Sequence, residues 1–151
     1  MKLAEALAER SDCQIRISEL QKRLVRVARV QEGEAAAEDT DKLLAEVEQL
    51  FQRQLMLISA INRTNAKTEY AKGKTISDAI AERDVPGKKR DFLRSVTDAA
   101  SVRQDRYTKS EVKFVATVSI AGLQKQIDQL SKQYREVDTQ LQELNWKTEL
   151  I

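Results

Sequence analysis

The sequence predicts an all-α protein of antiparallel coiled-coil hairpins, arranged as one four-helix-bundle-like domain over residues 1–151. Apolar residues recur at alternating spacings of three and four over long stretches, which is the pattern of coiled-coil helices. Four glycines and one proline are too few for the many turns of a sheet protein. A charged fraction of 33% with only 5% aromatics suits long, solvent-exposed helices with narrow apolar stripes.

The first helix is expected over about residues 2–31. Its stripe is interrupted only by Arg10, and Gly33 with the EAAAED run that follows should end it. The stripe consists of Leu3, Ala6, Arg10, Cys13, Ile17, Leu20, Leu24 and Val27. Cys13 lies on this stripe, so we expect a small buried hydrophobic side chain rather than a reactive thiol.

The second helix is expected over about residues 41–68, with Asp39, Thr40 or Asp41 as its N-cap. Its apolar residues cover more than one stripe, and a helix that is apolar over so wide an arc usually contacts partners on two sides. One partner can be the first helix, and the other can be the rest of the chain or another subunit. The predicted oligomer interface is Leu43, Leu44, Leu50, Phe51 and Leu55.

The distribution of charge favours an antiparallel arrangement of these two helices. The later half of the first helix is basic, with Arg16, Lys22, Arg23, Arg26 and Arg29. The linker and the start of the second helix are acidic, with Glu32, Glu34, Glu38, Asp39, Asp41, Glu46 and Glu48. Such charges favour the dipoles of both helices, and an antiparallel turn brings the opposite charges together.

After a turn at Gly73, a third helical region is expected over about residues 75–100, capped by Thr75 or Ser77. Pro86–Gly87 lies inside this region. Because proline lacks the backbone donor and clashes with the preceding turn, the sequence predicts a break or a strong kink near residue 86.

Residues 102–119 show no helical stripe and predict an extended segment, either a short hairpin or a packed loop. The fourth helix, over about residues 120–147, has the clearest stripe of all. That stripe is Ile120, Leu123, Ile127, Leu130, Tyr134, Val137, Leu141 and Leu144. Trp146 lies just past the stripe, and we expect it to close the end of the bundle.

Composition also bounds the chemistry of the protein. Without histidine, and with one cysteine and isolated glycines, the chain has no histidine-based triad, no thiolate cluster and no phosphate-binding loop. We therefore expect no catalytic residues, no metal and no cofactor. The acidic residues in MKLAEALAERSD argue against a signal peptide, and the apolar stretch near residues 55–61 is too short for a bilayer. We expect a cytoplasmic protein without membrane association.

Two places are candidates for ligand or partner contacts. Asn62, Arg63 and Asn65 follow the apolar part of the second helix, although ending that helix and bonding to its backbone is the favoured interpretation. The second place is the loop, where basic residues flank an aromatic one. Its candidates are Arg103, Arg106, Tyr107, Lys109 and Lys113.

The leading hypothesis is a non-enzymatic, oligomeric interaction or scaffold protein, with a further protein partner possible. The alternative is an RNA-binding helical hairpin that uses the basic residues of 83–113. The near balance of 26 basic and 24 acidic residues, a net charge of +2, weighs against nucleic acid. A third hypothesis is an enzyme that binds a small anion with Asn62, Arg63, Asn65 and Tyr107.

Six stretches of the chain resemble a family of small bacterial proteins sometimes labelled septicolysin. They are LAEAL (3–7), VQEGE (30–34), INRTN (61–65), DAIAERD (78–84), RYTKSEVKFVATV (106–118) and ELNWKTEL (143–150). The resemblance implies a helical bundle and a bacterial source, without an activity or catalytic residues to transfer. A cytolytic role has no support in the sequence, which shows neither an export signal nor an amphipathic pore strand. The resemblance also implies an uninterrupted helix where this chain has Pro86–Gly87–Lys88–Lys89.

Overall fold

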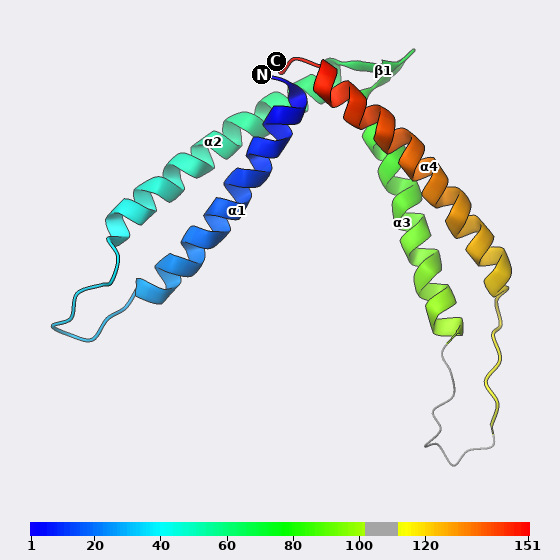
Figure 1. The fold of residues 1–151 in the computed structure, drawn as a ribbon, viewed down its shortest axis with the longest axis horizontal. Coiled ribbons are helices and arrows are strands. Elements are labelled where there is room, and N and C mark those ends of the chain that lie inside the picture. The colour runs from blue at the N-terminus through cyan, green and yellow to red at the C-terminus, as the bar shows by residue number, and fades with distance from the viewer. Residues whose placement is uncertain (102–111) are drawn as a thin grey trace. The chain divides into compact units, whose positions relative to one another are not determined.

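The structure is a computed structural model that describes residues 1–101 and 112–151. In chain order its elements are α1 (Leu3–Val27), α2 (Thr40–Lys67), β1 (Glu69–Ala71), β2 (Lys74–Thr75), α3 (Ile76–Ala100) and α4 (Ile120–Lys147) (Figure 1). The predicted all-α class, with bundle-like packing of helices, is confirmed. No helix in the described part of the chain is long and apolar enough to cross a membrane.

The chain divides into two compact units. Unit 1 consists of Met1–Thr68 and Glu143–Ile151, and unit 2 of Glu69–Gln142. Each unit is described separately below. That the chain forms one domain over residues 1–151 stays a prediction.

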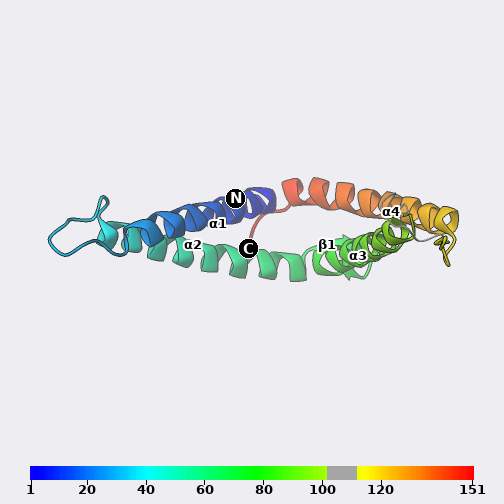
Figure 2. The ribbon, with the colours of Figure 1, turned by 90° about the horizontal axis from the view of Figure 1, so that it is seen from below.

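In unit 1, α1 and α2 pack side by side as an antiparallel hairpin (Figures 1 and 2). Its core joins residues of the predicted α1 stripe with residues of α2: Leu3, Ala6, Cys13, Ile17 and Leu20 from α1, and Leu43, Leu57 and Ile61 from α2. The expected burial of Cys13 is confirmed. Burying these side chains stabilises the hairpin by about 25 cal/mol for each Å² of apolar surface removed from water.

The predicted pairing of basic and acidic residues across the hairpin is also confirmed. Arg16 bonds to Glu46 at 2.6 Å, and Arg23 forms an ion pair with Glu38. These pairs are partly exposed, so each contributes little to stability by itself. They match the antiparallel direction, because a parallel pair would separate the basic end of α1 from the acidic start of α2.

The ends of the two helices follow from capping and burial. Asp39 is the N-cap of α2, and its carboxylate accepts a hydrogen bond from the backbone N–H of Lys42 at 3.1 Å. Helix α1 ends at Val27, earlier than the predicted residue 31. The four residues after Val27 bury no apolar side chain, and a short helical extension without packing is unstable in water.

A segment at the C-terminal end of the chain completes unit 1. The N–H of Leu3 donates to the Thr148 carbonyl, and the N–H of Leu150 donates to the Met1 carbonyl, both at 2.9 Å. The expectation that Trp146 closes the end of the bundle was wrong: its side chain is exposed, and its neighbour Asn145 is buried instead. Adjacent helical residues point about 100° apart, so burial of Asn145 turns Trp146 outward.

Unit 2 begins with a short antiparallel hairpin of β1 and β2. The predicted turn is present at Gly73, whose φ of 77° is a conformation that favours glycine. The two strands were not predicted, because they are too short to show an alternating pattern of apolar and polar residues. Thr75 then caps α3 in a reciprocal arrangement with Asp78, as one of the two predicted caps.

The predicted break near residue 86 was wrong, since α3 runs without interruption from Ile76 to Ala100 with Pro86 inside it. Gly87 is buried against the ring of Tyr134 on α4, and Arg83 donates to Asp138 of α4 at 2.9 Å. These contacts hold α3 against α4 on both sides of Pro86, which offsets the lost hydrogen bond.

We expect Gly87→Val to lower the melting temperature of the protein. A Cβ at Gly87 would lie 3.0 Å from Cδ2 of Tyr134, and the branched methyl groups of valine need still more room. Overpacking of this kind costs about 1–3 kcal/mol, more than the helix propensity gained by removing glycine. The measurement is thermal unfolding followed by circular dichroism. Ala81→Val, at an exposed site of the same helix, is the control and should melt close to wild type.

Residues 112–119 contain neither helix nor strand, which agrees with this part of the predicted extended segment. The rest of that prediction, residues 102–111, lies outside the described residues. Helix α4 begins at Ile120 and ends at Lys147, as predicted.

Candidate functional site

An exposed apolar stripe runs along the side of α2 that does not face α1. It consists of Leu44, Phe51, Leu55 and Ile58, whose exposed fractions are 55%, 50%, 67% and 38%. Spacings of seven, four and three residues place these side chains on one face of the helix, as in a coiled-coil seam. Helix α2 therefore has a buried seam against α1 and this outer stripe beside it.

The outer stripe overlaps with the predicted oligomer interface but is not identical to it. Leu44, Phe51 and Leu55 are exposed as that interface requires. Leu43 is only 7% exposed and belongs to the core of the hairpin, and Leu50 is half-buried. Ile58 belongs to the stripe and was missing from the predicted set. The wide apolar arc of α2 was visible in the sequence, but which part faces α1 was not.

Few charges lie beside the outer stripe. Between Leu44 and Ile58, α2 carries three charged residues, namely Glu46, Glu48 and Arg53. Glu46 and Arg53 point toward α1, where they pair with Arg16 and Glu9. Glu48 remains near the stripe and accepts a hydrogen bond from Gln52 at 3.0 Å.

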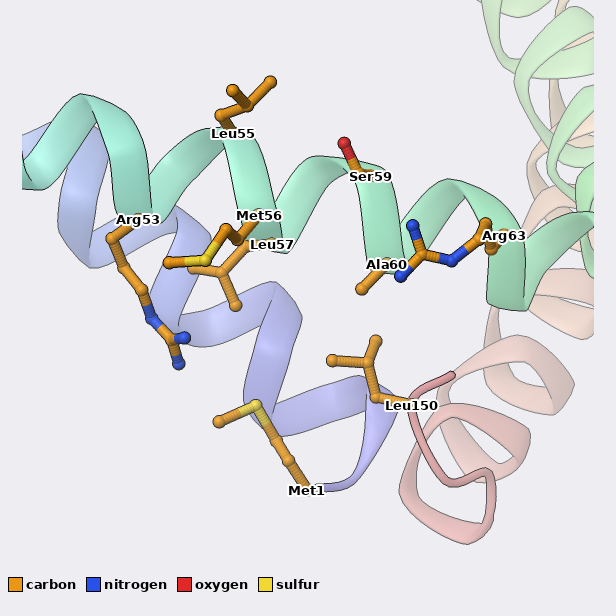
Figure 3. A pocket seen from close by; sticks show the side chains of 9 residues that line it. All are labelled: Met1, Arg53, Leu55, Met56, Leu57, Ser59, Ala60, Arg63 and Leu150. Carbon is orange, nitrogen blue, oxygen red and sulfur yellow. The ribbon is translucent and has the colours of Figure 1, made fainter.

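Unit 1 also has an open groove on another side of α2, with a volume of about 550 Å³ (Figure 3). Met56, Leu57 and Ala60 of α2 form one wall, and Met1 and Leu150 lie opposite. Arg53 and Arg63 also line the groove, one toward each end. Leu55 and Ser59 are on its rim, and Figure 3 shows their side chains pointing away from Met1 and Leu150.

The two arginines of the groove differ in their partners. Arg53 donates two hydrogen bonds to the Glu9 carboxylate, at 2.6 and 2.8 Å, and these bonds hold the pKa of Glu9 below its ordinary value. Arg63 is exposed, and within the described residues no carboxylate pairs with it. The positive charge of Arg53 is thus neutralised locally, whereas that of Arg63 is not.

The predicted contact residues around Arg63 separate in the structure. Asn62 is exposed, Asn65 is half-buried, and only Arg63 lines the groove. They do not end α2, which continues to Lys67, so that interpretation was wrong. Thr64 belongs to the same polar run but was not among the predicted contact residues, and it is fully buried. Its hydroxyl donates to the Ala60 carbonyl at 2.9 Å and accepts from the N–H of Ile151 at 3.0 Å.

The second predicted set of contacts is only partly visible. Arg103, Arg106, Tyr107 and Lys109 lie outside the described residues, and Lys113 is exposed.

Three of the basic residues expected to form an RNA-binding patch, Arg83, Arg90 and Arg94, pair with carboxylates, whereas Lys88 and Lys89 are exposed. Arg83 bonds to Asp84 and Asp138, each at 2.9 Å, and Arg90 bonds to Asp91 at 2.9 Å. Both guanidinium groups also lie over the ring of Tyr134. These two arginines hold α3 together with α4, which leaves them poorly placed to bind phosphates.

The fold and the exposed surfaces define a helical-hairpin protein. The chain belongs to a family of unknown function (DUF6847), which it matches over residues 10–150. A solved structure, described as a functionally unknown conserved protein from Corynebacterium diphtheriae, is 46% identical, with a TM-score of 0.90 over 100% of this chain and 99% of that chain. No curated protein matches. These findings agree with a family without an assigned function, and they show no link to septicolysin-like proteins.

Proposed function

We propose that this protein is a non-enzymatic interaction protein of the cytoplasm that acts as a homodimer joined through the outer stripe of α2. The observation that carries the proposal is the stripe itself, with Leu44, Phe51, Leu55 and Ile58 exposed along one helix face. Singly exposed apolar side chains are normal, but contiguous apolar patches usually mark an interaction site.

The spacing of the stripe favours a second copy of the same chain as the partner. Leu44 and Ile58 lie seven residues before and after Phe51. If two α2 helices pack antiparallel about a two-fold axis at Phe51, Leu44 of one copy meets Ile58 of the other. A two-fold interface requires such a self-complementary surface, because the same patch serves both subunits.

The residues beside the stripe fit the same arrangement. The axis at Phe51 places Leu55 opposite Val47 of the second copy, which adds an apolar contact. It places Glu48 opposite Gln54, so the acidic side chains of the two copies do not meet. Like charges across an interface would cost several kcal/mol, and this register avoids them.

A disulfide cross-link tests both the dimer and its register. In a Cys13→Ser background, Phe51→Cys places two thiols at the two-fold axis, within reach of a disulfide. We expect oxidation to give a covalent dimer, and light scattering at micromolar concentration to give twice 17.2 kDa for the unmodified protein. Met56→Cys, which lies in the groove, is the control and should cross-link poorly. A monomeric mass for the unmodified protein would refute the dimer.

A further inference from the structure

The groove of unit 1 is open to solvent and large enough to hold a small molecule. Its volume of about 550 Å³ lies within the range of about 300–1,000 Å³ that is usual for such sites. Its walls are mainly apolar, with Met1 and Leu150 facing Met56, Leu57 and Ala60 (Figure 3). Methionine side chains are flexible and polarisable, so Met1 and Met56 can adjust their conformations to the shape of a ligand.

The charge of the groove is concentrated at one end. Arg63 presents a guanidinium group without a carboxylate partner among the described residues, whereas Arg53 at the other end is held by Glu9. Figure 3 shows the Arg63 side chain extended along α2 toward Ala60, beside the apolar wall. A planar guanidinium group recognises a carboxylate through two parallel hydrogen bonds. The groove therefore complements a ligand with one carboxylate and an apolar body.

The length of the apolar wall limits the body of that ligand. Arg53 and Arg63 are ten residues apart on α2, which corresponds to about 15 Å along the helix axis. An alkyl chain of medium length can span this distance while its carboxylate lies at Arg63. A dicarboxylate is disfavoured, because its second anion would meet an arginine that Glu9 already neutralises, with Glu9 itself beside it.

We propose that the groove binds the anion of a free, medium-chain fatty acid. The Arg63 guanidinium group holds the carboxylate, and the alkyl chain lies between Met56, Leu57 and Ala60 on one wall and Met1 and Leu150 on the other. This site is independent of the proposed dimer: Phe51 does not line it, and the side chain of Leu55 on its rim points away from Met1 and Leu150.

The test is isothermal titration calorimetry of the full chain with dodecanoate below its micelle concentration. We expect saturable binding of one dodecanoate per chain. Hexanoate, which has the same carboxylate and too short a chain, should bind much more weakly. Dodecyltrimethylammonium, with the same alkyl chain and the opposite charge, should not show saturable binding of one molecule per protein chain. Equal binding of the cationic and anionic amphiphiles would overturn the proposal, because the charge of Arg63 would then have no role.

Two variants locate the ligand. Arg63→Gln should weaken dodecanoate binding by about tenfold or more, as expected for the loss of a charged hydrogen-bonding partner. Arg10→Gln removes an exposed arginine from α1 and is the matched control, with unchanged affinity expected. Ala60→Phe should fill the groove and abolish binding while circular dichroism remains that of a helical protein. Unchanged binding in Arg63→Gln would place the ligand elsewhere and overturn the assignment.

Two further measurements separate this proposal from its alternatives. The Phe51→Glu variant, in which the proposed dimer is disrupted, should bind dodecanoate as the wild type does. The dimer and the fatty-acid site can therefore be tested independently, and either can fail while the other holds. Vesicles of phosphatidylcholine with phosphatidylglycerol should not capture the protein. Capture that depends on Arg63 would show that the groove recognises a membrane surface, and would overturn a free fatty acid as its ligand.

Discussion

Leu20→Asp is expected to unfold the hairpin of unit 1. Leu20 is 1% exposed in the seam between α1 and α2, so the new carboxylate would be buried without a partner. An unpaired buried charge costs several kcal/mol, and the lost packing of the leucine adds about 2–5 kcal/mol. Whole domains are stable by only about 5–15 kcal/mol. Circular dichroism during heating should therefore show reduced helicity at room temperature and an early, broad transition.

The control for this variant is Ile15→Asp. Ile15 lies on the same helix, five residues earlier, with its side chain exposed to solvent. Its replacement by aspartate makes the same chemical change without burying a charge, so the melting temperature should change little. If Leu20→Asp melted like wild type, the assignment of the α1 stripe to the core would be contradicted.

Phe51→Glu is expected to halve the mass of the protein in solution. In the proposed dimer, the two copies of residue 51 lie at the two-fold axis, so the substitution places two carboxylates face to face. Such a contact costs several kcal/mol, and each 1.4 kcal/mol weakens an equilibrium about tenfold, so the dissociation constant should rise at least about a hundredfold. Light scattering should then give 17.2 kDa at micromolar concentration.

Helicity distinguishes loss of the dimer from loss of the fold. Phe51 is half-exposed and lies outside the core of the hairpin, so the variant should keep the circular dichroism of a helical protein. Val25→Glu introduces the same charge at an exposed apolar residue of α1 and should leave the dimer intact. A Phe51→Glu protein with the wild-type mass would show that the outer stripe is not the interface.

Local physics explains why much of the fold could be predicted. The stripes of α1, α2 and α4 repeat at the helical period, and that period does not depend on the rest of the structure. Caps such as Asp39 and Thr75 act within one turn, so they too can be recognised in the sequence. The residues of the candidate sites were harder to predict from the sequence. Leu44, Phe51, Leu55 and Arg63 were identified, but Leu43 could not be separated from them until the position of α1 was known.

The sequence by itself determined where the helices of this protein lie, because a 3–4 spacing of apolar residues repeats at the helical period. Tertiary structure alone decided the continuity of α3 and the groove of unit 1. Pro86 stays helical because Tyr134 and Asp138, far along the chain, hold α3 in place. The groove exists because Met1 and Leu150 meet beside α2, and Thr64 anchors that end of the chain. Contacts between residues so distant in sequence leave no periodic pattern, so only the folded chain reveals them.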